Sequence, residues 1–291
     1  MNIYQTVTER ILEQLAAGQI PWRKTWTTGL PKSLTTGREY RGINILMLSA
    51  AEYTSRYWIT YRQALRLGGF VREGEKATTV VYWKWRTAEE LTKLAEKAGN
   101  DNLSPCVPFA SSVFNLDQVE GIIRPEDDVS NRRHDRLKVA DQMLEVMPDK
   151  PRIAHAAGAD PAYHPVTDCV MLPGLSQFEN ADHYYAVLFH ELVHSSGHPR
   201  RLNRFAGEEG GKMEQYSFEE LVAEFGSAFL CAFAGISNPA NEALQASYIE
   251  GWASVLRKEP GMLLRAASAA QRAADYIRGK LPVNEELAAA A

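Results

Sequence analysis

Cysteine is scarce in this chain of 291 residues, and long hydrophobic runs are missing. The 3 cysteines, Cys106, Cys169 and Cys231, lie far apart without a CxxC pair, which argues against a disulfide framework and a cysteine zinc site. The longest apolar run, residues 228–236, is 9 residues long, whereas a helix needs about 20 to cross a bilayer. The first ten residues lack the basic and apolar regions of a secretory signal. The sequence therefore predicts reduced thiols, no membrane partner and a cytoplasmic location.

Histidine is absent from the N-terminal part of the chain, since all 7 histidines lie between His134 and His198. The net charge of −4 is also unevenly distributed. Residues 20–86 carry 12 Lys and Arg against 4 Asp and Glu, a net charge of +8, so the rest of the chain carries −12. The same window holds 5 of the 6 tryptophans. Segments that differ in charge, tryptophan and histidine content predict two domains with different functions.

The pattern of apolar and turn-forming residues predicts an α+β fold. We expect an N-terminal α+β domain over 1–125, a charged linker over 126–134, a mainly helical domain with a small sheet over 135–284, and a tail over 285–291. In the first domain the expected helices are 3–17, 42–51 and 60–67, and the expected strands are 78–85 and 107–116, with a loop over 99–104 between them. In the second, a helix over 135–147 precedes short strands near 153, 163 and 169–172, and then three further helices.

The strongest chemical signal is the HExxH motif formed by His190, Glu191 and His194. On a helix, residues i and i+4 share one face, so both imidazoles can bind a single Zn²⁺. Glu191 then faces a water molecule at the metal and can act as its general base. The alternative interpretation is a pair of helix-surface histidines beside a carboxylate, but the spacing is the one that zinc ligation requires.

A catalytic zinc needs a third protein ligand. Glu220 is the favoured candidate, with Glu224 on the same helix face, because the pair resembles the gluzincin arrangement in which a second carboxylate supports a ligand histidine. Ser217 and Glu220 also match a capping box, and if Glu220 only closes that box, Glu224 becomes the ligand. His198 is a further alternative ligand, although Arg200 occupies the position of the third histidine in the metzincin spacing. The expected ion is Zn²⁺, with other divalent metals such as Mn²⁺ as alternatives.

Aromatic rings and cations alternate through the basic window. Single-stranded nucleic acid binds such surfaces because bases stack on rings while Lys and Arg contact phosphates, with little sequence preference. About half of the rings are expected in a core; on a strand, Trp83 and Trp85 share one face, and Tyr82 and Lys84 the other. The candidate DNA-binding residues are Trp22, Arg23, Lys24, Trp26, Tyr40, Arg41, Arg56, Trp58, Lys84 and Arg86.

Two sets of motifs together resemble a known family. They are residues 21–26, 40–44 and 113–118 in the N-terminal part, and 190–198, 201–202, 219–224 and 248–252 in the C-terminal part. This combination resembles the ArdC antirestriction family over nearly the whole chain. The resemblance implies a single-stranded-DNA-binding domain joined to a zincin-like metallopeptidase domain. It also implies a protein that plasmids and other mobile elements carry to protect incoming DNA from host restriction.

Two functions of different classes follow. In the first, the protein binds single-stranded DNA and hydrolyses a peptide, with a protein substrate such as a restriction component. A peptide could then pair with an edge strand over 168–172, although that segment fits a core strand equally well. In the second, the protein only shields DNA and its metal site is structural or a relic. A zinc-dependent nuclease is a weaker third alternative, because HExxH chemistry is chiefly peptidolytic.

Overall fold

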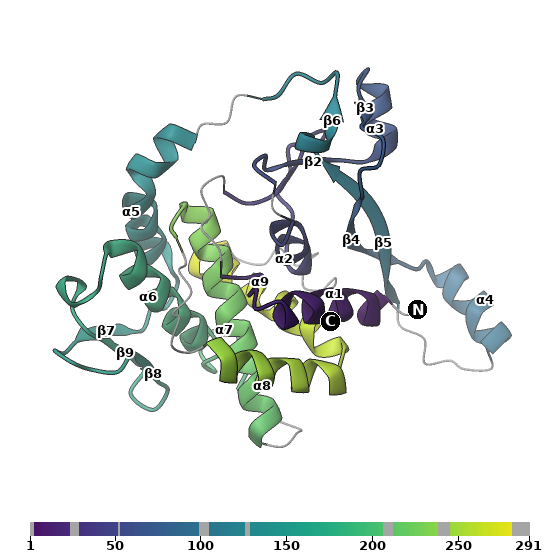
Figure 1. Cartoon of the computed structure of the whole chain (residues 1–291). Coiled ribbons are helices and arrows are strands. Elements are labelled where there is room, and N and C mark those ends of the chain that lie inside the picture. Colours follow the sequence, from purple (N-terminus) through teal and green to yellow (C-terminus); the bar gives the residue numbers. More distant parts are fainter. Residues whose placement is uncertain are drawn as a thin grey trace.

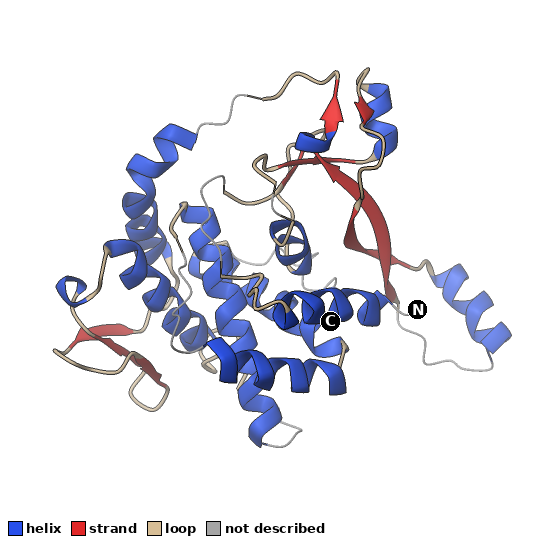
Figure 2. Ribbon diagram, viewed as in Figure 1, coloured by secondary structure: helices blue, strands red, loops and turns tan. Residues whose placement is uncertain are grey.

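The computed structural model has the mixed α+β architecture that the sequence predicts (Figure 1). It describes residues 3–23, 29–51, 53–98, 105–125, 129–205, 212–237 and 245–280. Most helices form a central body, with a small sheet on one side and the strands of the N-terminal half on the other (Figure 2). The helices are α1 (Ile3–Ala16), α2 (Ile43–Ser49), α3 (Tyr61–Arg66), α4 (Ala88–Ala98), α5 (Val129–Val146), α6 (Ala181–Ser196), α7 (Lys212–Ala234), α8 (Gln245–Lys258) and α9 (Gly261–Ile277). The strands are β1 (Lys32–Ser33), β2 (Tyr57–Ile59), β3 (Phe70–Val71), β4 (Thr78–Trp85), β5 (Cys106–Asn115), β6 (Val119–Glu120), β7 (Arg152–His155), β8 (Ala162–His164) and β9 (Cys169–Leu172).

Strands β4 and β5 form a long antiparallel ribbon in the N-terminal half. They pair from Thr78 opposite Val113 to Trp85 opposite Cys106. With β2 and β1 they make a sheet of order β1-β2-β5-β4, so β4 is an edge strand. The two long strands confirm the sequence prediction, which set them at 78–85 and 107–116.

Helix α4 lies between these strands in the chain, ahead of the predicted loop over 99–104 and over residues for which the sequence prediction named no element. Thr87 and Glu90 form a capping box at its start: the Thr87 side chain accepts a hydrogen bond from the Glu90 N–H, and the Glu90 carboxylate accepts one from the Thr87 N–H. The T-x-x-E pattern that marks this helix was therefore present in the sequence. The predicted loop over 99–104 lies outside the described residues.

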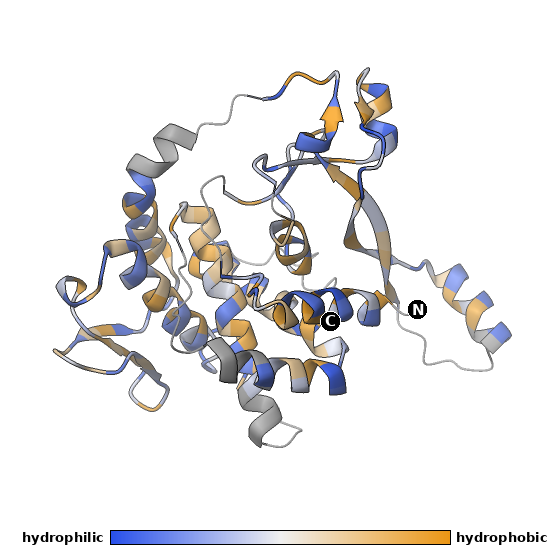
Figure 3. Ribbon diagram, viewed as in Figure 1, coloured by the Kyte–Doolittle hydropathy of each residue, from blue (hydrophilic) through white to orange (hydrophobic). Residues whose placement is uncertain are grey.

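Helix α1 packs into the hydrophobic core of the C-terminal helices. Its buried face, Val7, Ile11 and Leu15, belongs to one core cluster with residues of α6, α7 and α9. Thr8 Oγ1 donates a hydrogen bond to the Pro260 carbonyl at 3.0 Å, which fixes α1 beside the turn between α8 and α9. Helix α2, which is predominantly hydrophobic in Figure 3, contributes to the same cluster. The core thus continues across the expected boundary near residue 125, and the division into domains stays a prediction.

The C-terminal half departs from the sequence prediction in three places. Helix α5 begins at Val129, inside the predicted linker, while residues 126–128 and the tail over 285–291 lie outside the described part of the chain. The proposed edge strand over 168–172 is wrong, because β9 lies in the middle of a sheet of order β7-β9-β8 and β8 lies at its edge. In the described part of the chain four α-helices, α6 to α9, follow this sheet where the sequence predicted three, since Glu259 and Pro260 separate α8 from α9. Every helix in the described ranges is too short or too polar to span a membrane.

Candidate metal centre

Helices α6 and α7 pack closely and carry the motif and the favoured third ligand. Residues 190–194 lie on α6, and Glu220 lies on α7. Gly226 of α7 contacts Val193 of α6, and a Cβ at Gly226 would come within 2.7 Å of a Val193 methyl carbon. A glycine is therefore needed for this close approach of the two helices.

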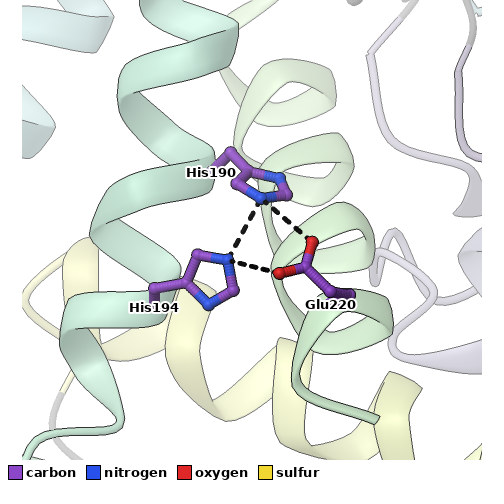
Figure 4. A group of neighbouring side chains, drawn as sticks. All are labelled: His190, His194 and Glu220. Atoms are coloured by element: carbon purple, nitrogen blue, oxygen red, sulfur yellow. Dashed lines mark hydrogen bonds and ion pairs between the residues drawn. The ribbon is translucent and has the colours of Figure 1, made fainter. Parts of the chain in front are cut away.

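The side chains of His190, His194 and Glu220 converge (Figure 4). The two Nε2 atoms are 3.1 Å apart. Glu220 Oε2 is 3.7 Å from His190 Nε2, and Glu220 Oε1 is 3.6 Å from His194 Nε2. Ligand atoms of a tetrahedral metal with bonds of about 2.0–2.2 Å stand roughly 3.3–3.6 Å from one another. The residues present thus fit a divalent cation with two nitrogen ligands and one oxygen ligand.

A salt-bridged carboxylate orients His194. Glu219 Oε1 is 3.4 Å from His194 Nδ1, so the imidazole can direct Nε2 toward Glu220. Arg204 in turn holds Glu219 through two hydrogen bonds of 3.1 and 2.7 Å. Arg204 also donates to the Val193 carbonyl at 2.7 Å, which ties the pair to the HExxH helix. The sequence prediction missed both Glu219 and Arg204; the only signal was that a ligand histidine needs a partner for its second nitrogen.

The electrostatics of the two imidazoles differ. Burial lowers the pKa of His190 to about 4, with the neighbouring His194 acting in the same direction, so His190 is neutral at physiological pH, as a metal ligand must be. Burial alone would also lower the pKa of His194, but the hydrogen bond with Glu219 and the negative charge of Glu220 outweigh it and raise that pKa. Burial acts to raise the pKa of Glu219, while His194 and Arg204 together lower it further than burial raises it.

Glu191 lies beside this cluster and is only 7% exposed. Burial raises the pKa of its carboxyl group, although a nearby His194 and a hydrogen bond with the Tyr163 backbone oppose the shift. The carboxylate faces a pocket of about 480 Å³ into which edge strand β8 also projects. The pocket is lined by Pro161, Ala162, Tyr163, Pro165, His190, Glu191, His194, Phe205, Glu219 and Glu220.

The two alternative ligands lie outside the cluster. Glu224 is held instead by Arg23, whose guanidinium bonds both of its carboxylate oxygens. His198 lies past the end of α6, where its Nδ1 accepts a hydrogen bond from the Arg200 N–H at 3.2 Å. Ser217 does not cap a helix, because α7 begins at Lys212 and Ser217 lies within it. The capping-box alternative is therefore wrong.

Three of the proposed DNA-binding residues are buried. Trp22 and Trp58 are 0% and 2% exposed, so neither ring can stack on a base, and Arg56 is 4% exposed beneath Glu39. These three assignments are corrected: the side chains are packed in the interior, where apolar area is removed from water. The Trp22 ring contacts Phe225 edge-on, with 4.9 Å between centroids.

The remaining candidates that the structure describes divide into three groups. Arg23 and Arg41 form ion pairs with Glu224 and Asp275 of the C-terminal helices. Tyr40 packs against a buried cluster that contains Trp58, and burial raises the pKa of Tyr40. Lys84 lies on the exposed end of the ribbon and Arg86 follows it, half-buried. Lys24 and Trp26 lie outside the described residues.

Two family descriptions match consecutive parts of the chain. The N-terminal domain of the anti-restriction factor ArdC matches residues 1–114, and the zincin-like metallopeptidase family MPTase-PolyVal matches residues 140–269. Together they contain every residue of the convergent cluster and the whole of the basic window.

Proteins of similar sequence and structure agree with these matches. A DNA primase TraC of Escherichia coli is 36% identical over 94% of this chain, which spans 27% of that primase and 20% of a second TraC. An uncharacterized protein, y4eC, of Sinorhizobium fredii is 33% identical, with 96% of this chain and 92% of that protein covered. The crystal structure of the antirestriction protein ArdC from plasmid R388, in its Mn(II)-bound form, superposes with a TM-score of 0.76 at 32% identity, covering 96% of this chain and 98% of that one. The chain therefore belongs to the ArdC antirestriction family and carries a zincin-like metallopeptidase region.

Proposed function

We propose that this protein binds single-stranded DNA through its N-terminal half and hydrolyses peptide bonds at a divalent metal centre. In the cytoplasm this combination protects incoming mobile-element DNA from host restriction. The observation that carries the peptidase part is the convergence of His190, His194 and Glu220, with Glu191 beside them in an open pocket. The DNA-binding part is supported by the +8 charge of residues 20–86 and by the ArdC N-terminal family match.

The donor set determines what the metal centre can do. His190, His194 and Glu220 would hold the ion, which when bound would polarise a carbonyl oxygen and activate water. Glu191 is placed to accept a proton from a water molecule in the pocket and to pass it to the leaving amine. Its burial supports this role, because a raised pKa brings a carboxylate closer to the working pH of a general acid and base.

The edge strand β8 supports a peptide as the substrate. Pro161, Ala162, Tyr163 and Pro165, in this strand or directly beside it, line the pocket together with residues of α6 and α7. Among the described residues, strand β8 pairs only with β9, so its second edge can add an extended peptide by backbone hydrogen bonds. A restriction component of the host is the class of protein substrate that fits the antirestriction family.

Two histidines and one carboxylate suit Zn²⁺ well, and Mn²⁺ is the alternative because the relative from plasmid R388 was crystallised with Mn(II). Metal analysis of the purified full chain tests the ligand set. We expect one bound ion per chain in the wild type and in Glu191→Gln, and loss of the ion in Glu220→Gln. Glu224→Gln is the matched control on the same helix and should keep its ion. Loss of metal in Glu224→Gln alone would contradict this assignment.

The competing function is a DNA-shielding protein whose metal site is structural. Glu191→Gln separates the two, because it keeps the metal ligands but removes the general base. The measurement is the survival of plasmid DNA after transfer into a restricting recipient cell that expresses either the wild type or the Glu191→Gln variant. We expect protection to fall with Glu191→Gln. Full protection by a folded, metal-loaded Glu191→Gln variant would show that proteolysis is not the protective activity.

A further inference from the structure

The outer half of the β4–β5 ribbon exposes a group of large aromatic side chains. Tyr82, Trp83, Trp85 and Phe109 are 51%, 45%, 42% and 42% exposed, whereas Val81, which directly precedes them, is 3% exposed. Both faces of the ribbon are open from Tyr82 onward. A group of exposed aromatic rings at the edge of a sheet promotes aggregation unless a ligand covers it. We therefore expect this surface to bind a ligand.

The rings are arranged for stacking on both faces. Tyr82 lies opposite Phe109, and their rings are nearly parallel, with centroids 5.9 Å apart and an interplanar angle of 24°, so the two form an aromatic pair on one face of the ribbon. On the other face, Trp83 and Trp85 are two residues apart along the strand, a spacing of about 6.6–6.8 Å. That is roughly twice the 3.4 Å spacing of stacked bases, so one base has room between the two rings.

Cations accompany the rings in the same segment. Lys84 lies between the two tryptophans in the sequence, and Arg86 follows them. Lys84 Nζ pairs with Glu90 Oε1 of α4 at 3.3 Å, with the two side chains 54% and 44% exposed. Exposed pairs of this kind are weak, so a phosphate group can take the place of Glu90. The segment therefore offers both base stacking and phosphate contact.

The ribbon is anchored where exposure begins. The Asn44 side chain of α2 bonds both backbone groups of Val81: its Nδ2 donates to the carbonyl at 2.6 Å, and its Oδ1 accepts from the N–H at 2.6 Å. This pairing covers the free edge of β4 at its last buried residue. The outer half therefore extends from a fixed base, which keeps its rings in place before a ligand arrives.

We propose that single-stranded DNA binds to the outer β4–β5 ribbon through unpaired bases stacked on Tyr82, Phe109, Trp83 and Trp85. The proposal rests on the proposed DNA binding and assigns the surface responsible. Duplex DNA binds this ribbon more weakly, because its paired bases cannot reach the rings.

The test uses the full chain and a fluorescein-labelled oligothymidylate, longer than a site of about 4–16 nucleotides, in an anisotropy titration. Trp83→Ala and Tyr82→Ala should each weaken binding by roughly 5- to 100-fold, the range expected for losing one stacked base. The double variant Trp83→Phe/Trp85→Phe should keep most of the affinity, because each phenyl ring still stacks. The matched control is Tyr61→Ala/Phe70→Ala, two residues of the same N-terminal half that are each 51% exposed on α3 and β3. This control should bind as the wild type does.

The outcomes separate the ribbon from the wider function. If the wild type fails to bind the oligothymidylate, the proposed DNA binding is wrong and the ribbon assignment falls with it. If the wild type binds and the ribbon variants bind equally well, DNA binding stands and the ribbon assignment is overturned. A loss confined to Tyr61→Ala/Phe70→Ala would move the interface to α3 and β3. Sedimentation of the same variants would reveal whether the ribbon instead joins two copies of the chain, which would also overturn the proposal.

Discussion

The guanidinium of Arg23 binds the carboxylate of Glu224 through two hydrogen bonds, 3.1 Å from Nε to Oε2 and 2.6 Å from Nη2 to Oε1. The sequence assigned these residues to different sites, Arg23 to DNA and Glu224 to the metal centre. Their ion pair is largely shielded from water, with the two side chains 15% and 10% exposed. This ion pair fixes the N-terminal segment to α7, one helical turn beyond Glu220. The same helix therefore anchors part of the basic window and carries a candidate metal ligand.

Arg23→Met should destabilise the protein by about 3 kcal/mol, because it leaves the carboxylate of Glu224 buried without its partner. Urea unfolding of the full chain measures this change. The matched control is Lys93→Met, which breaks an exposed ion pair with Glu89 and should cost less than about 1 kcal/mol. Adding Glu224→Gln to Arg23→Met should restore part of the lost stability. Equal stability of the Arg23→Met and Lys93→Met variants would contradict the prediction.

Trp22→Ala should lower the free energy of unfolding by about 3–5 kcal/mol, as expected for removing a large buried ring. The ring fills a pocket between Phe225 and Trp252, with centroids 4.9 and 5.2 Å away. Trp83→Ala removes a ring of the same kind from an exposed site and should change stability by less than about 1 kcal/mol. Thermal and urea unfolding of the two variants provide the comparison. If Trp22→Ala proves as stable as Trp83→Ala, the buried position of Trp22 is wrong.

Arg204→Met should weaken metal binding by about 10- to 100-fold, because Glu219 loses the partner that holds it against His194. Calorimetric titration of the metal-stripped full chain with Zn²⁺ gives the affinity. Arg204→Lys should recover only part of it, since a lysine cannot make both hydrogen bonds at once. Arg265→Met is the control, because Arg265 forms an exposed ion pair with Glu259 away from the centre. Unchanged zinc affinity in Arg204→Met would remove Arg204 from the metal site.

The pair formed by Asp168 and Arg201 should make stability sensitive to acid. Burial of Asp168 acts to raise its pKa, but hydrogen bonds from Arg201 and Tyr163 outweigh burial and lower that pKa below its ordinary value of 3.8. A carboxylate whose pKa is lowered by folding stabilises the protein fully above its unfolded pKa, and this contribution is lost as pH falls through the folded value. The stability difference between wild type and Asp168→Asn should therefore be constant above about pH 5 and shrink below pH 4.

Urea unfolding at several pH values measures that difference. At neutral pH, Asp168→Asn should cost about 3 kcal/mol, because the Arg201 side chain is 0% exposed and would lose its negatively charged partner and one of its two 2.7 Å bonds to the carboxylate. Asp160→Asn, at an exposed position ahead of β8, is the control and should change stability little. A difference that persists unchanged to pH 2 would contradict a role for the charged form of Asp168.

Local signals predicted the elements of this protein well. The spacing of Val7, Ile11 and Leu15 indicated the buried face of α1, and the β-branched and aromatic residues of 78–85 indicated β4. Helix α4 was missed although Thr87 and Glu90 form the capping box that marks its start. The order of the strands in a sheet could not be predicted from local signals, because the sequence of β9 fits an edge strand as well as a central one. In the structure β9 lies between β7 and β8.

The sequence by itself determined the chemistry that is available. The HExxH spacing places two imidazoles on one helix face, and the +8 window with its rings is suited to nucleic acid. Only the tertiary structure decided which residues meet. Glu220 lies beside the two histidines, while Glu219 pairs with His194 and Glu224 pairs with Arg23. Trp22 and Trp58 are buried in the interior, whereas Trp83 and Trp85 are exposed to solvent. The physical reason is that ligation, salt bridging and burial depend on distances between elements far apart in the chain, and those distances are set by how helices and strands pack.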